Sequence, residues 1–190
     1  YGGHLVEWLH RGEMDLALMY GPSVDLHLSV ETIGRDDIVA VGPKGSGLAG
    51  RKEVSIEWLS EQKLVLPSHS HGLRILIEKA LSRKNLPIQV LIEADSFRVL
   101  TSFVEDGLGY TLLPHSAVRA DAVAGRLEVA AIAKPGITRE LIVALPAERQ
   151  PSIATAAISE FIKIEIERLR AEGLWDIRME AADHPDAILR

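Results

Sequence analysis

The sequence contains no cysteine among its 190 residues, which excludes a disulfide framework and thiolate chemistry. It has no run of three consecutive lysines or arginines, and its net charge of -6 is unlike that of a nucleic-acid-binding chain. No apolar segment approaches the roughly 18 residues of a membrane-spanning helix. The first residues also lack the basic and apolar regions of a signal peptide. With 47% hydrophobic and 25% charged residues, the chain can bury a globular core, as one domain or two small ones.

Short apolar segments bounded by turn residues alternate with segments of helical periodicity. The predicted strands cover residues 15–21, 36–43, 63–67, 88–94, 109–114, 126–132 and 139–146. The predicted helices include one over 73–84, one from Phe97 that is closed by Gly107, and one from Ser152 to about Glu172. Because strands and helices alternate along the chain, we expect an α/β fold with largely parallel sheets.

Ligands of open α/β sheets bind beyond the carboxyl ends of the strands, where loops lead into helices. Four turns of this kind lie at 20–24, 67–72, 95–97 and 113–116. In the second, which we call the Ser/His loop, serines and histidines alternate as Ser68, His69, Ser70 and His71. We interpret this loop as a cradle for a carboxylate, formed by the two hydroxyls, a histidine and the first N–H groups of the following helix. The alternative is helix capping by Ser70 or His71.

The Ser/His loop raises two further possibilities. As a metal site it supplies only His69 and His71, and a third ligand, such as His115 or Asp95, would have to come from elsewhere. As a hydrolase site it lacks the GxSxG motif, and sequence neighbours rarely reach nucleophile–base geometry. We therefore predict no metal site, no catalytic residue and no cofactor.

Residues 45–50, GSGLAG, match the GxGxxG spacing of a dinucleotide-binding loop. That motif must open a helix and needs an acidic residue about 20 positions later. Here the glycines lead into RKEVS, and residues 68–72 contain no acid. The stretch also lacks the Lys and Ser/Thr that follow the last glycine of a Walker A motif. We interpret it as a flexible connection.

Several segments follow one another in the order of a known family. GEMDLAL (12–18), HGLRILIEKAL (71–81) and FVEDGLGYTLLPHSAV (103–118) resemble the effector-binding domain of LysR-type transcriptional regulators, and the similarity extends over residues 3–170. The resemblance implies a two-lobed fold like that of type II periplasmic binding proteins, with a mostly parallel sheet in each lobe and a small-molecule cleft between them. The implied divisions are lobe I at 1–45 and 137–170, lobe II at 46–136, a hinge near 43–45 and 135–137, and a C-terminal extension at 171–190.

Together with the Ser/His loop, the resemblance gives a set of effector contacts. These are Ser68, His69, Ser70, His71, Leu113, Pro114, Ser116, Tyr20, Gly21 and Ser23. In this family the loop at 113–116 closes over the effector, and the turn after Tyr20 would face it from the other lobe. Arg74 and Arg98 are possible partners of a carboxylate. The alternatives are a turn in which Ser116 caps a helix, a core tyrosine at position 20, and solvated surface arginines.

The helix-turn-helix of the family does not occur in this sequence, nor do the first strand, helix and second strand of lobe I, so we expect an N-terminally truncated domain. We therefore expect a non-enzymatic, effector-sensing domain that binds a small anionic metabolite. It would contact DNA only through the helix-turn-helix of a full-length protein, form a homo-oligomer and act in the cytoplasm, away from membranes. The alternative function is that of a solute-binding protein of a transport system on the same fold.

Overall fold

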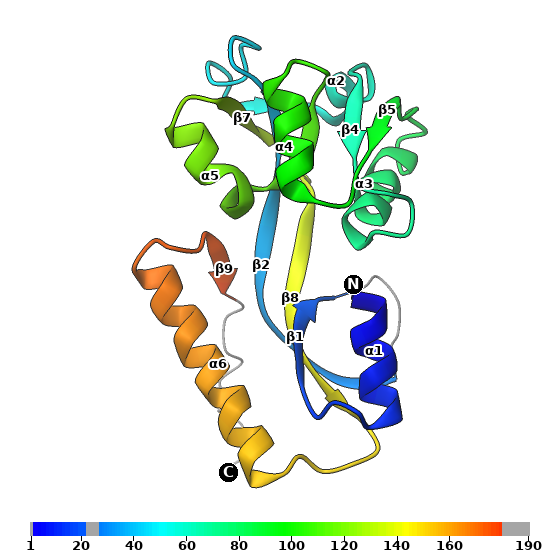
Figure 1. The fold of residues 1–190 in the computed structure, drawn as a ribbon, viewed down its shortest axis with the longest axis vertical. Helices are drawn as coiled ribbons and strands as arrows, with labels where there is room; N and C mark the ends of the chain where they lie inside the picture. The colour runs from blue at the N-terminus through cyan, green and yellow to red at the C-terminus, as the bar shows by residue number, and fades with distance from the viewer. Residues whose placement is uncertain (1, 22–26, 180–190) are drawn as a thin grey trace, which may run out of the picture.

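The computed structural model describes residues 2–21 and 27–179. Its helices are α1 (Gly2–Arg11), α2 (Ile56–Ser60), α3 (Gly72–Ser82), α4 (Phe97–Glu105), α5 (His115–Val123) and α6 (Ile153–Ala171). Its strands are β1 (Ala17–Tyr20), β2 (Leu28–Pro43), β3 (Glu53–Val54), β4 (Leu64–Leu66), β5 (Val90–Glu93), β6 (Thr111–Pro114), β7 (Leu127–Ile132), β8 (Thr138–Pro146) and β9 (Ile177–Met179). The long strands β2 and β8 run through the middle, with α2–α5 at one end and α1 and α6 at the other (Figure 1).

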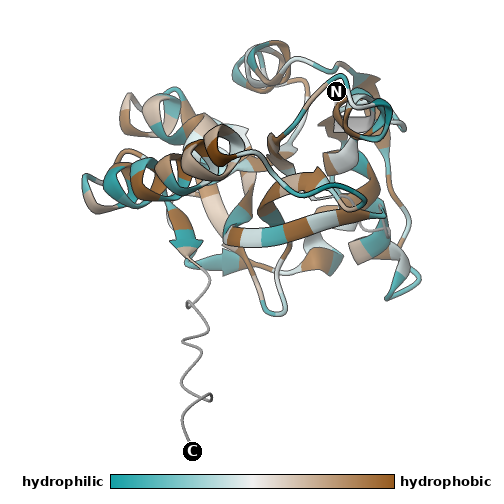
Figure 2. Cartoon of the chain, turned by 90° about the horizontal axis from the view of Figure 1, so that it is seen from below, coloured by the Kyte–Doolittle hydropathy of each residue, from teal (hydrophilic) through white to brown (hydrophobic). Residues whose placement is uncertain are grey.

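Sheet A consists of β1, β8, β9 and the first part of β2, all paired antiparallel. Successive side chains of β8 point to opposite faces of the sheet. Ile142 packs with Leu9 of α1 in one buried cluster. Leu141 and Val143 pack with Ile166 of α6 in another. Sheet A is therefore the middle of three layers, and the helices that cover it carry both hydrophilic and hydrophobic segments, as amphipathic helices do (Figure 2).

Sheet B begins where β2 changes partners, between Asp37 and Ile38. Beyond this point β2 pairs antiparallel with β6 and β7, and β3 adds parallel to β7. β4 and β5 form a separate parallel pair, which an isolated bridge from Leu64 joins to Tyr110. The largest buried cluster fills this end of the molecule, between these strands and α2–α5.

The predicted α/β class is confirmed, but the prediction of mostly parallel sheets is wrong. Five of the seven strand pairings within 2–21 and 27–179 are antiparallel, including all of sheet A. An apolar segment indicates burial but not strand direction, because direction depends on distant partners such as Asp37 and Thr138. The sequence pattern also misses residues 28–35 of β2, β3 and β9, which carry no long apolar run.

The chain crosses between the two sheets twice, and the crossings lie side by side. The N–H of Ile38 on β2 donates to the carbonyl of Ile137, just before β8, at 2.9 Å. The two ends of the molecule are thus connected by adjacent, hydrogen-bonded segments. The predicted lobe boundaries remain predictions. Among the described helices, none combines the length and the apolar content of a membrane span.

Candidate functional site

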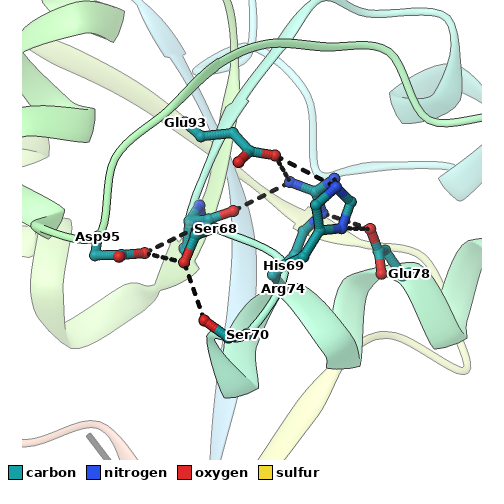
Figure 3. Close-up of polar contacts among 8 residues, drawn as sticks. Ser68, His69, Ser70, Arg74, Glu78, Glu93 and Asp95 are labelled. Atoms are coloured by element: carbon teal, nitrogen blue, oxygen red, sulfur yellow. Dashed lines mark hydrogen bonds and ion pairs between the residues drawn. The ribbon is translucent and has the colours of Figure 1, made fainter.

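The Ser/His loop joins β4 to α3, and the loop after β5 lies beside it. Because β4 and β5 are parallel, the loops that follow them emerge at the same edge. Oδ1 of Asp95, from the second loop, accepts hydrogen bonds from the N–H of Ser68 at 2.9 Å and from its hydroxyl at 2.8 Å (Figure 3). Ser70 Oγ lies 3.4 Å from Ser68 Oγ. The structure therefore brings together two of the four predicted strand-end turns.

His71 is the N-cap residue of α3. Its Nδ1 accepts a hydrogen bond from the N–H of Leu73 at 3.1 Å, and its ring lies 5.9 Å from that of Phe97. Burial lowers the pKa of His71, with Asp95 opposing this effect and Arg139 adding to it. The neutral imidazole is therefore favoured, and because Nδ1 accepts, Nε2 carries the proton and can donate. His71 is a cap, as one interpretation predicted; the carboxylate cradle remains a prediction.

His69 points to the other side of the loop, toward Arg74 (Figure 3). Arg74 is only 2% exposed and donates to Oε1 of Glu78 at 2.7 Å and to Oε1 of Glu93 and the Pro67 carbonyl at 3.1 Å each. Nδ1 of His69 lies 3.1 Å from the same Glu78 oxygen. The interpretation of Arg74 as a solvated surface residue is wrong, because two carboxylates and a carbonyl compensate its buried charge. Arg74 fastens the loop, and its role as an anion partner remains a prediction.

The two histidines of the loop therefore have different contacts: His71 caps α3, whereas His69 lies against Arg74 and Glu78. No group of three or more His, Cys, Asp or Glu side chains within the described part of the chain is placed to hold a metal ion. His69, Arg74 and Glu93 line an open pocket of about 470 Å³ together with β5. Arg98 is exposed on α4 and lines a second pocket, of about 260 Å³, against α5.

The predicted effector loop at 113–116 connects β6 to α5. Leu113 and Pro114 end β6 and are buried, whereas Ser116 is half-buried in the first turn of α5. Capping by Ser116 is wrong, because α5 already begins at His115 and Pro114 occupies the N-cap position. Nδ1 of His115 lies 2.8 Å from Oδ2 of Asp176, in the segment after α6.

Tyr20 ends β1 and belongs to a polar cluster that sequence reasoning missed. Its hydroxyl donates to Oδ2 of Asp36 at 3.0 Å, and Nη2 of Arg139 donates to the same oxygen at 2.8 Å. Asp36 is fully buried, and its Oδ1 has no hydrogen-bond partner among the described residues. Burial raises the pKa of Tyr20 to about 12. Gly21 donates its N–H to β8, and Ser23 lies outside the described residues.

The GSGLAG loop closes around a carboxylate of the chain itself. Oε1 of Glu128, on β7, accepts from the N–H of Gly45 at 2.8 Å, and its Oε2 accepts from the N–H of Ala49 at 3.3 Å and the hydroxyl of Ser46 at 3.0 Å. These hydrogen bonds, that of Gly45 foremost, lower the pKa of Glu128. The donors of this loop are therefore used by a carboxylate of the chain itself.

The family described as LysR substrate binding domain matches residues 1–166. The chain belongs to this family. This LysR domain is 29% identical over 171 residues to the HTH-type transcriptional regulator BbuR of Bordetella bronchiseptica, a match that covers 90% of the chain and 53% of BbuR. It is 27% identical over 161 residues to the nitrogen assimilation regulatory protein nac of Escherichia coli, covering 85% of the chain and 52% of nac. The chain thus spans about half the length of these curated relatives.

Solved structures show the same fold. The regulatory domain of CcmR from Synechocystis PCC6803, in complex with 2-PG, matches this LysR domain with a TM-score of 0.74 at 19% identity, over 85% of the chain and 78% of CcmR's. The effector binding domain of QuiR, in complex with shikimate, matches with a TM-score of 0.73 at 17% identity, over 87% of the chain and 78% of QuiR's. The predicted family and its non-enzymatic, effector-binding class of function are confirmed.

Proposed function

We propose that this LysR domain senses a small metabolite that carries a carboxylate or another anionic group. Two domains of the same fold, those of CcmR and QuiR, were solved with 2-PG and shikimate, which supports a small-molecule effector here. The charge of the effector follows from the donors that the Ser/His loop offers.

The observation that carries the proposal is the set of hydrogen-bond donors at the start of α3. Ser68 uses its N–H and its hydroxyl on Asp95, so it holds the loop in place. Ser70 Oγ and the Nε2–H of His71 remain as donors, beside the first amides of α3 at the positive end of the helix dipole. An anionic group that reaches this point gains several donors at once.

Tyr20 and Arg139 form the opposite wall of the proposed site. The positive charge of Arg139 contributes to the lowered pKa of His71, after the larger effect of burial. Leu113, Pro114 and Ser116 complete the site from the end of β6, as the family resemblance implies.

We further propose that the site lies between two lobes, 1–45 with 137–170 and 46–136, joined by a hinge. The change of partners of β2 between Asp37 and Ile38, next to Ile137, supports a division between the two ends of the molecule, at an earlier position on β2 than the predicted hinge at 43–45. Effector binding would then shift the population of lobe arrangements, because the effector prefers one arrangement over another.

In the whole regulator, this shift would be passed to a helix-turn-helix and change transcription in the cytoplasm. An apolar row on α6 supports a homo-oligomer, since Ile158, Phe161 and Ile164 are 55%, 65% and 66% exposed. The coding sequence upstream of Tyr1 distinguishes the two functions considered. A helix-turn-helix there supports the regulator, and a signal peptide supports a solute-binding protein.

The direct test is the melting temperature of the purified chain with millimolar shikimate, 2-PG, other carboxylates, and uncharged analogues as controls. An effector at about 100 times its Kd adds roughly 2.7 kcal/mol to the free energy of unfolding. For a domain of this size that corresponds to a rise of about 5–10 °C. A rise with one class of acid, absent with its amide or ester, supports the proposal. Equal responses to acids and uncharged analogues would contradict the anionic part of it.

A further inference from the structure

We propose that residues 173–179 form a strap that holds the two ends of the molecule at a fixed separation, with Asp176 as a positioning residue that acts on the effector loop through His115. These residues lie beyond 1–166, which the family matches. The link to an effector rests on the proposed function above, whereas the restraint between the two ends does not.

One end of the strap is bound firmly to sheet A. β9 pairs antiparallel with residues 34–36 of β2, and Ile177 is only 3% exposed within the cluster under α6. Gly34 shows how closely the strap lies on β2, because a Cβ there would stand 2.7 Å from the carbonyl oxygen of Arg178. Arg178 adds an ion pair to Asp37 at 2.6 Å.

The other end of the strap is held to α5 by polar contacts. His115 and Asp176 meet at 2.8 Å, with side chains 37% and 44% exposed. One turn further along α5, Arg119 donates to the carbonyl of Gly173. Gly173 has a positive φ of +68° and follows the last turn of α6, so the chain leaves the helix there toward α5.

This difference between the two ends of the strap indicates that its contacts with α5 break before its pairing with β2. A buried strand pairing is strong, whereas an exposed ion pair contributes little to stability and responds to its surroundings. His115 lies between Pro114 and Ser116, both predicted effector contacts, so a displacement of this loop must strain or break the contact with Asp176. The strap therefore couples the effector loop to the end of α6.

The absence of cysteine from the sequence allows a direct distance measurement. Val123→Cys on α5, which is 83% exposed, and Ala157→Cys on the exposed side of α6 give two sites for spin labels. Distances between them are measured by pulsed electron paramagnetic resonance in three backgrounds: the labelled parent, Asp176→Asn and Arg178→Gln. Arg178→Gln is the matched control, since it removes an ion pair of the strap on the sheet A side only.

We expect Asp176→Asn to broaden or shift the distance distribution, and Arg178→Gln and the conservative Asp176→Glu to keep the parental one. Amide exchange in α5 should accelerate about two- to fivefold in Asp176→Asn, the range for loss of an exposed ion pair. A parental distribution and parental exchange in Asp176→Asn would overturn the strap. The outcome is independent of the effector test: if no acid raises the melting temperature, the sensor proposal fails while the distances still decide the strap.

Discussion

The guanidinium of Arg139 stacks on the ring of Tyr20, with its central carbon 3.3 Å from the ring centroid. The two residues come from β8 and β1, which pair antiparallel in sheet A. Both also bond one oxygen of the buried Asp36, so a cation, a ring and a carboxylate form a single unit.

Removing the cation from this unit should destabilise the fold strongly. In Arg139→Gln, Asp36 keeps a buried charge without its partner, and we expect a loss of about 3–5 kcal/mol in the free energy of unfolding. Urea denaturation measures this loss. The matched control is Arg35→Gln on the neighbouring β2, whose exposed ion pair with Glu140 should change stability by less than about 1 kcal/mol. Similar small losses in both variants would contradict the structural role of Arg139.

Tyr20 should make the stability fall at high pH. Burial raises its pKa from 10.0 to about 12, so the unfolded chain loses the phenolic proton at a lower pH than the folded protein. The stability that this shift contributes is fully present below pH 10 and is lost as the pH rises through 12. Urea midpoints across this range should fall in the wild type and fall less steeply in Tyr20→Phe. Tyr110→Phe is the control. An equally reduced slope of the urea midpoint in this variant would show that Tyr20 is not the cause of the pH dependence.

Glu128 should make a second contribution, at acidic pH. Its pKa is lowered by the hydrogen bonds from Gly45, Ala49 and Ser46, so its contribution is present above its ordinary value of 4.5 and is lost as the pH falls through the folded pKa. Melting temperatures should therefore separate wild type from Glu128→Gln at neutral pH and converge at acidic pH. Glu165→Gln, which loses only a helical ion pair with Arg168, provides the comparison. A constant gap at every pH would show that the charge of Glu128 is not responsible.

The Ser/His loop should determine the affinity for an acidic effector. Ser70 can donate one hydrogen bond to the effector, and Ser68 holds the loop through its hydrogen bond to Asp95. Removing both hydroxyls in Ser68→Ala with Ser70→Ala should therefore cost about 1–3 kcal/mol of binding free energy and weaken an acid found by melting roughly 5- to 100-fold. Circular dichroism should show an intact fold, because Ser70 is exposed, Ser68 is half-buried, and both lie in a loop outside the hydrophobic core. Ser102→Ala on α4, whose hydroxyl bonds the Arg98 carbonyl of its own helix, should leave the affinity unchanged. Wild-type affinity in the double variant would refute the cradle.

Much of the local structure could be predicted from the sequence. The apolar segments that end at Tyr20, Leu66 and Pro114 are strands, and the turns after Leu66 and Glu93 do meet at one edge. These features follow from periodicity and turn residues, which are local. The family order of the motifs then added the domain type, which no single segment reveals.

The polar clusters could not be predicted, because their members are far apart in the chain. Asp36 and Arg139 are 103 residues apart, and each by itself is only a charged residue near the start of an apolar strand. The contacts of Arg74 could not be predicted for the same reason, since its partner Glu93 lies on the next parallel strand. β9 was missed for another reason: its three residues are too few for an alternating pattern, and only β2 gives them a partner.

β2 passes from sheet A to sheet B without interruption, and it carries β8 beside it up to the crossing. This hydrogen-bonded pair resists stretching, with one irregularity in its register between Thr32 and Gly34, whereas the twist between adjacent strands varies over a range of about 10–35°. A rearrangement of the two ends must therefore be mainly a rotation about the axis of this pair. The hydrogen bond between Ile38 and Ile137 joins the two strands at the crossing, so it can turn with the motion and need not open. The paired strands would therefore transmit a rotation from one end of the molecule to the other, while the distance between the two ends would hardly change.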